Sequence, residues 1–142
     1  MSAPNEQNGP ADRYEQGDAV YEQVYGSARP ERGQSLYVDV MIEQLFAEVW
    51  SREALPVRDR RLLVMGVLAA QGALDKVEMQ LRRAVEIGEL TVDQVDEVVL
   101  HLSHYIGWGL ASPLAMVAAS MRTPLDDSEA DDSGPDDGGK ER

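Results

Sequence analysis

The chain has 142 residues and a formal net charge of −13, and 43% of its residues are apolar. This length suits one domain with a substantial core, and the negative charge argues against nucleic acid or an anionic membrane as a partner. There is no cysteine, which excludes disulfides, thiolate metal sites and thiol peroxidase chemistry. No stretch has the pattern of a signal peptide or the length of a membrane span, so we expect a cytoplasmic protein.

Both ends of the chain are predicted to be disordered, on either side of one helical domain over residues 12–122. Residues 1–11 are polar and show no helical pattern. Residues 123–142 contain eight acidic and two basic residues among Gly, Pro and Ser, a composition that cannot bury an apolar core. We expect this acidic tail to act as a solubilising extension.

Residues 12–26 are predicted to form the first helix, which Gly26 can end. Their apolar side chains recur at helical spacing: Tyr14, Val20 or Tyr21, and Val24. Residues 27–35 are expected to be a connector. A second helix is predicted over residues 36–50, where four apolar side chains lie on an approximate helical stripe: Leu36, Val40, Leu45 and Val49.

The middle of the chain contains two more predicted helices. Pro56 suits the start of the third helix. Residues 61–72 are apolar nearly all the way round, which is typical of a central buried helix, and this helix is expected to end near Gly72. Residues 74–88 are amphipathic with Gly88 as the C-terminal cap. Their inward side is predicted to consist of Val77, Leu81, Ala84 and Val85.

The last two predicted helices cover residues 91–108 and 110–122. Thr91, with Gln94 three residues later, matches a capping box. No segment alternates convincingly between apolar and polar residues as a strand would. We therefore predict an all-α fold, a single-domain bundle of about six or seven helices.

The only two histidines, His101 and His104, lie in the helix predicted over residues 91–108. On a helical wheel the large apolar residues cluster on one side, and Glu97, His101, His104 and Trp108 fall together on the other. An indole on this second face is unusual for a stripe that faces solvent. The pattern suggests the wall of a pocket or of a subunit contact.

Three interpretations of this stripe remain open. Glu97 can simply pair with His101 one turn later on a partly exposed face. Alternatively, Glu97 favours the protonated form of His101, and the imidazole transfers protons near neutral pH. The pattern E-x-x-x-H-x-x-H also offers three metal ligands. Because the chain has no further histidine to complete the ligand set, we predict no metal.

The chain resembles the carboxymuconolactone decarboxylase family, which is related to alkylhydroperoxidase D, over roughly residues 13–120. The segments that carry the resemblance are RYEQGDAVYEQVYG at 13–26, EVWSREALPVRDRRLLVMGVLAAQG at 48–72 and QLRRAVEIGELTVDQVDEVVLHLSHYIGW at 80–108, with the small-residue helix that follows. The helix-turn-helix that contains Gly88 and Thr91 is the most specific part.

This resemblance implies a ring-shaped homo-oligomer, a trimer or a hexamer, with pockets between subunits. It also implies a cofactor-independent decarboxylase that acts on a small carboxylated lactone or a similar acid, in the breakdown of aromatic compounds. The chain departs from the family pattern at Gln80, where decarboxylases usually carry a histidine. The alternative is a non-catalytic member of the family, a ligand-binding or scaffolding oligomer.

The family's reference reaction suggests roles for particular residues. Loss of CO2 sends an electron pair into the lactone carbonyl, so the substrate is its own electron sink and no cofactor is needed. Under this resemblance, His101 transfers the proton and Glu97 orients it. Further candidates to bind the substrate are Gln80, His104, Tyr105 and Trp108. An arginine fork suits a substrate carboxylate, and the candidates for it are Arg58, Arg61 and Arg82.

Overall fold

A computed structural model of the chain describes residues 10–122, so the disorder predicted at residues 123–142 and at residues 1–9 of the leader lies outside its range. Residues 10 and 11, predicted to belong to the disordered leader 1–11, instead begin helix α1. The elements are α1 (Pro10–Tyr25), α2 (Leu36–Val40), the π-helix η1 (Met41–Trp50), α3 (Val57–Ala70), α4 (Leu74–Glu86), α5 (Val92–Ile106) and α6 (Trp108–Arg122). The predicted all-α fold is confirmed for the described residues. None of their helices is long and apolar enough to cross a membrane.

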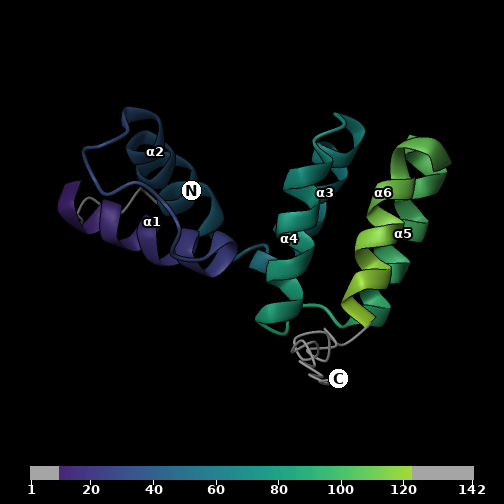
Figure 1. Cartoon of the computed structure of the whole chain (residues 1–142). Helices are drawn as coiled ribbons and strands as arrows, with labels where there is room; N and C mark the ends of the chain where they lie inside the picture. Colours follow the sequence, from purple (N-terminus) through teal and green to yellow (C-terminus); the bar gives the residue numbers. More distant parts are fainter. Residues whose placement is uncertain (1–9, 123–142) are drawn as a thin grey trace, which may run out of the picture.

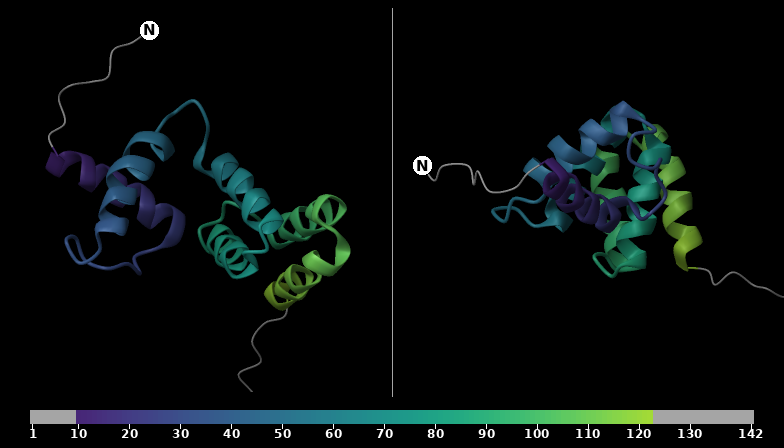
Figure 2. Two further views of the ribbon diagram at one scale, coloured as in Figure 1. Left: turned by 90° about the horizontal axis from the view of Figure 1, so that it is seen from above. Right: turned by 90° about the vertical axis from the view of Figure 1, so that its left-hand side faces the viewer.

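The helices form two groups that meet at the C-terminal end of α1 (Figure 1). One group consists of α1, α2 and η1, the other of α3 to α6, and Figure 2 shows the same separation from above. Each group has its own core. Val24, Phe46 and Trp50 are the buried centre of the first, and α3, α4, α5 and α6 all contribute buried side chains to the second, among them Met65 and Leu81.

The first group packs α1 against η1, and here one part of the sequence prediction is wrong. Tyr14 and Val24 are buried as expected. The predicted stripe of the second helix, however, is exposed: Leu36, Val40, Leu45 and Val49. The buried residues are Ile42, Phe46, Ala47 and Trp50. Residues 41–50 wind as a π-helix with more residues per turn, so a wheel drawn for an α-helix assigns the wrong side to Leu45 and Val49. Leu36 and Val40 belong to α2, which buries no residue.

The prediction of a helix buried on all sides over residues 61–72 is correct for one side only. Arg61, Met65 and Ala69 of α3 are fully buried. Leu63 and Val67 lie on the opposite side of the helix and are 63% and 57% exposed. The described part of one chain therefore leaves an apolar strip on the surface of α3.

The predictions for α4 agree with the structure. Val77, Leu81 and Ala84 are fully buried, and α4 ends at Glu86, shortly before Gly88. Gly88 has a φ of 74°, a left-handed conformation that glycine adopts without steric cost.

The predicted start of α5 is confirmed, but its predicted end is not. The Thr91 hydroxyl accepts a hydrogen bond from the Gln94 N–H at 3.2 Å, and the Gln94 side chain accepts one from the Thr91 N–H at 3.0 Å. This is the predicted capping box. Gly107, with a φ of 90°, ends the helix after Ile106. Trp108 is thus the first residue of α6 and does not continue the helical stripe of α5.

Two arginines attach the end of α1 to the second group of helices. Arg61 Nη1 donates to the Val24 carbonyl at 2.7 Å. Arg83 donates to the carbonyls of Gln23 at 3.3 Å and Glu22 at 2.9 Å. The last carbonyls of a helix have no partner within the helix and favour nearby cations. The attachment fixes Arg61 where the two groups meet.

Candidate active site

The predicted proton-transfer residues Glu97 and His101 lie on an exposed face of α5. Together with Leu62, Val98 and Leu102 they line an open hollow of about 390 Å³. No ion pair joins Glu97 to His101 among the salt bridges of residues 10–122. The hollow thus brings the two side chains to one place without pairing them.

His104, Tyr105 and Trp108 gather where α5 ends and α6 begins. The rings of His104 and Trp108 meet edge to face at 5.4 Å between centroids, and the His101 and Tyr105 rings lie 5.0 Å apart. His104 Nδ1 is 2.8 Å from the Leu100 carbonyl oxygen. These aromatic pairs are exposed, so the predicted stripe does not form an enclosed pocket in one chain.

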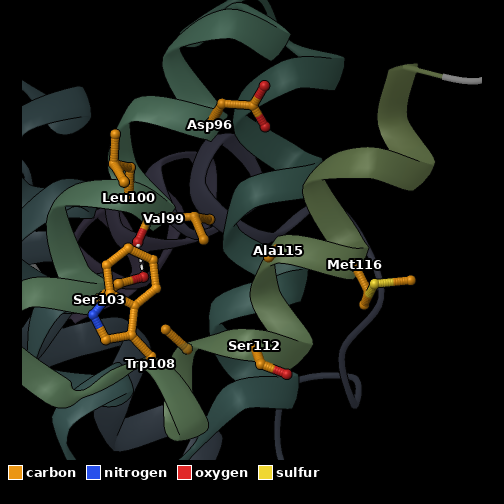
Figure 3. Close-up of a pocket in the computed structure, with 9 residues that line it drawn as sticks. Asp96, Val99, Leu100, Ser103, Trp108, Ser112, Ala115 and Met116 are labelled. Atoms are coloured by element: carbon orange, nitrogen blue, oxygen red, sulfur yellow. Dashed lines mark hydrogen bonds between the residues drawn. The ribbon is translucent and has the colours of Figure 1, made fainter.

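Trp108 also lines a groove of about 490 Å³ between α5 and α6. Figure 3 shows the indole beside Ser103, with Met116 and Ala115 on the α6 side. The Ser103 hydroxyl donates to the Val99 carbonyl at 2.8 Å, and Asp96 is held by Arg122, with 2.8 Å between Nε and the carboxylate. Two polar side chains of the groove, Ser103 and Asp96, are thus engaged, and most of its lining is apolar.

The E-x-x-x-H-x-x-H pattern does not converge on one point. In the part of the chain that the structure describes, no three His, Asp or Glu side chains lie close enough together to hold a metal ion.

A second group of polar side chains lies inside the molecule, around Arg61. The Arg61 side chain is fully buried and its Nε donates to Glu89 at 2.6 Å. Its Nη1 donates to the Val24 carbonyl at 2.7 Å and to the Oε1 of Gln80, which is also fully buried. Glu89 follows α4 and is mostly buried. We call Tyr25, Arg61, Gln80 and Glu89 the buried polar cluster.

Two nitrogen atoms of this cluster have unused hydrogen-bond donors. Arg61 Nη2 and Gln80 Nε2 are buried, and neither has a partner among the described residues. Because a buried donor without an acceptor costs free energy, the pair favours an acceptor that comes from outside the chain. Arg61 Nη2 is bonded to the same carbon as Nη1, and Gln80 Nε2 is bonded to the same carbon as Oε1. Both free donors therefore lie beside the Nη1–Oε1 hydrogen bond.

Tyr25 is the half-buried member of the buried polar cluster. Its ring packs against Tyr21 and Phe46, with centroids 5.2 and 5.9 Å away. Burial raises the pKa of the Tyr25 phenol above its ordinary value of 10.0. A contact with the Gln80 side chain, outside regular hydrogen-bond geometry, and the Arg61 charge partly oppose this rise. The phenol therefore stays neutral near physiological pH and can donate a hydrogen bond.

The other two predicted arginines are partly exposed and are engaged by other groups. Arg58 Nε donates to the Glu89 carbonyl at 3.2 Å. Arg82 donates to Glu78 at 2.8 Å and to Ser120 at 3.3 Å. Of the three arginines predicted to bind a carboxylate, Arg61 alone combines complete burial with an unpartnered buried nitrogen in the described structure.

The structure thus separates the predicted site residues into two groups. Glu97 and His101 share the hollow, and Arg61 and Gln80 share the buried polar cluster. The hollow includes Leu62, the neighbour of Arg61 in α3, and adjacent helical residues point in different directions. The hollow and the buried polar cluster share no residue.

Sequence reasoning missed Tyr25 and Glu89. A signal for Glu89 existed, because Arg61 opens an apolar run and a buried arginine needs a carboxylate partner. Several acids could have filled that role, and the sequence does not say which one returns to α3. No local signal singles out Tyr25 from its neighbour Tyr21.

Comparison with known proteins gives a family for the chain. Residues 37–120 match the family model described as "Carboxymuconolactone decarboxylase family". A 4-carboxymuconolactone decarboxylase from Acinetobacter baylyi is 34% identical over 102 residues, which cover 67% of this chain and 75% of that protein. No solved structure gives a significant match.

Proposed function

Because the chain belongs to the carboxymuconolactone decarboxylase family, we propose that it removes CO2 from a small carboxylated lactone. The similar protein from Acinetobacter baylyi is a 4-carboxymuconolactone decarboxylase. 4-Carboxymuconolactone is therefore the first substrate to test, and related lactone acids are the next.

The reaction needs no cofactor because the lactone accepts the electrons. The bond between the ring carbon and the carboxylate breaks, CO2 leaves, and the electron pair moves through the conjugated system to the lactone carbonyl oxygen. A carbon atom of this conjugated system then takes up one proton, the electron pair leaves the oxygen, and the carbonyl re-forms. The protein has to bind the acid, stabilise the negative oxygen and deliver the proton.

The observation that carries the proposal is the pair of unpartnered donors in the buried polar cluster. Arg61 Nη2 and Gln80 Nε2 are buried and lack acceptors among the described residues. A lactone acid offers such acceptors, and donors held in a dry site stabilise a developing oxyanion strongly. The amide at Gln80, in the place of the usual histidine, can fill this role because it donates without titrating.

The proton is assigned to His101, with Glu97 as the residue that orients it. The hollow that both line supports this assignment. Because no residue of the buried polar cluster lines the hollow, we infer that His101 of one copy acts on a substrate held by another copy. His104, Tyr105 and Trp108 would line the contact between copies.

The assembly would be a trimer or a hexamer, as the resemblance implies. The exposed apolar strip of α3, with Leu63 and Val67, supports burial against a second copy. The setting of the activity would be the breakdown of aromatic compounds in the cytoplasm.

Purified protein incubated with 4-carboxymuconolactone tests the proposal by the release of CO2. His101→Asn and Glu97→Gln should each abolish turnover while helix content and oligomer size stay unchanged, and His104→Asn should cost less. If the unaltered protein binds lactone acids but releases no CO2, the chain is the non-catalytic ligand-binding alternative. If His101→Asn stays active but dissociates the oligomer, the stripe is an interface and the proton has another source.

A further inference from the structure

We propose that Arg61 and Gln80 bind the lactone carbonyl oxygen of the substrate, rather than its carboxylate. This inference rests on the proposed function and specifies which part of the substrate the buried polar cluster holds. The two unpartnered nitrogens, Arg61 Nη2 and Gln80 Nε2, supply the donors.

The charge of the buried polar cluster favours a neutral acceptor before the reaction. The Arg61 charge is already balanced by Glu89, which accepts its Nε–H at 2.6 Å, and Tyr25 and Gln80 are neutral. A carboxylate would bring an extra, uncompensated negative charge into a buried place, which is costly. A carbonyl oxygen adds no net charge on binding and becomes negative only as CO2 leaves.

Catalysis also favours this assignment. An enzyme accelerates a reaction only through interactions that are stronger in the transition state than in the ground state. Hydrogen bonds to the carboxylate weaken as it becomes neutral CO2, so an arginine clamp on it would raise the barrier. Hydrogen bonds to the carbonyl oxygen strengthen as the electron pair arrives there, so the same donors would lower the barrier.

The donors are held in place before any substrate binds. Arg61 is fixed by Glu89, by the Val24 carbonyl and by Gln80 Oε1. The contact with Arg61 also sets the orientation of the Gln80 amide, because its oxygen accepts from the guanidinium and its NH2 group is left as the free donor. Fixed donors of this kind need little reorganisation during the reaction.

Access to the donors is expected beside Tyr25, the half-buried member of the cluster. The residue lies at the end of α1, where the two helix groups meet, and Gly26 follows it with a φ of 87°. A lactone that enters there would meet the phenol hydroxyl. The phenol hydroxyl would then be a third neutral donor.

Binding of tetronate tests the inference without any turnover. Tetronate is an unsaturated γ-lactone that carries a negative oxygen at neutral pH, so it resembles the species formed when CO2 leaves. Tetronate should bind at least tenfold more tightly than neutral 2(5H)-furanone. Gln80→Leu should weaken tetronate binding about 10- to 100-fold, as expected for a lost hydrogen bond to a charged oxygen, and should leave 2-furoate, a carboxylate probe, within threefold.

Arg83→Lys is the matched control, because Arg83 also holds the end of α1 but is not part of the buried polar cluster. It should leave tetronate binding unchanged. A crystal of the unaltered protein with tetronate gives a reading that needs no variant, and should place a lactone oxygen within hydrogen-bond distance of Arg61 Nη2 and Gln80 Nε2. Tetronate found in the Glu97–His101 hollow, or no binding at all, would overturn the inference.

Steady-state kinetics distinguishes the two assignments if the protein is active. A role at the carbonyl predicts that Gln80→Leu lowers kcat and leaves KM nearly unchanged. A raised KM with an unchanged kcat would instead identify a carboxylate site and contradict the inference, while the proposed decarboxylation would stand. Conversely, tight tetronate binding by an inactive protein would support the site and remove the proposed function.

Discussion

Gly17 sets how closely α1 can approach η1. A Cβ atom built at this position would lie 2.1 Å from the Ile42 carbonyl oxygen and 2.9 Å from the Ile42 carbonyl carbon. Both are backbone atoms and cannot rotate away as a side chain could. Any larger residue must therefore push the two helices apart and disturb the first core, in which Phe46 and Trp50 are buried.

Gly17→Ala should lower the free energy of unfolding by about 2 kcal/mol, because overpacking at a backbone contact outweighs the better helix propensity of alanine. Gly66→Ala is the control, since a Cβ there meets nothing within 4 Å and should stabilise α3 by about 1 kcal/mol. Urea denaturation measures both changes. Equal effects at the two positions would show that the close approach of α1 to η1 is absent in solution.

Tyr25 links the buried polar cluster to stability at high pH. Burial raises the pKa of its phenol above 10.0 in the folded state, so the folded chain holds this proton more tightly than the unfolded chain does. The stability from this neutral phenol is complete below the unfolded pKa of about 10. It is lost as the pH rises through the folded pKa.

Urea denaturation across the alkaline range should therefore show a steeper loss of stability for the unaltered protein than for Tyr25→Phe, which cannot ionise there. Tyr37→Phe is the matched control, since the Tyr37 side chain is 77% exposed, and it should follow the unaltered protein. Parallel curves for Tyr25→Phe and the unaltered protein would contradict the burial of the phenol.

At the scale of elements, the sequence predicts helices well where one amphipathic face meets one core. The inward face of α4 and the capping box of α5 depend on side chains within a few positions of one another, so local patterns are sufficient. The exact start of α6 was missed because Gly107 can continue a helix or break it. Its φ of 90° breaks the helix, and the sequence around Gly107 does not distinguish the two outcomes.

Residues 36–50 show where a local pattern fails. A helical wheel assumes the α-helical repeat, whereas η1 has a wider turn in which Ser51 N–H donates to the Phe46 carbonyl five residues earlier. The close contact between Gly17 and the Ile42 backbone lies in this region. Because a contact with another helix accompanies the π-helix, residues 36–50 alone do not reveal which side is buried.

The candidate site was predictable in its residue types but not in its arrangement. Arg61, Gln80, Glu97 and His101 were all candidates from the sequence. Their division between the hollow and the buried polar cluster depends on where Glu89 and the end of α1 return in space, since these groups hold the Arg61 side chain. Such contacts join residues that are far apart in the sequence, and no periodicity records them.

At the scale of the whole molecule, the chain has more apolar surface than its own helices cover. The exposed side chains include Leu63 and Val67 on α3 and Leu100, Trp108 and Met116 along the α5–α6 groove. Exposed apolar patches of this kind favour association. The hollow and the buried polar cluster share no residue within one chain, and in the proposed assembly two copies would bring them to one substrate.

Mixed oligomers test whether one active site is built from two copies. His101→Asn and Gln80→Leu should each be nearly inactive alone. When they are co-expressed, each copy retains one of the two residues. If a site is built from two copies, it is intact where a His101→Asn copy provides the buried polar cluster and a Gln80→Leu copy provides His101. Random assembly therefore predicts recovery of about a quarter of the activity of the unaltered protein.

If both residues act on a substrate within the same copy, every site in the mixture lacks one of them and no activity returns. Light scattering on the same samples separates this result from a failure to assemble, since a monomer of 15.6 kDa would show that no shared site can form. A mixture of His101→Asn with Glu97→Gln is the control. These two residues line the same hollow, so they belong to the same copy in any arrangement and their mixture should remain inactive.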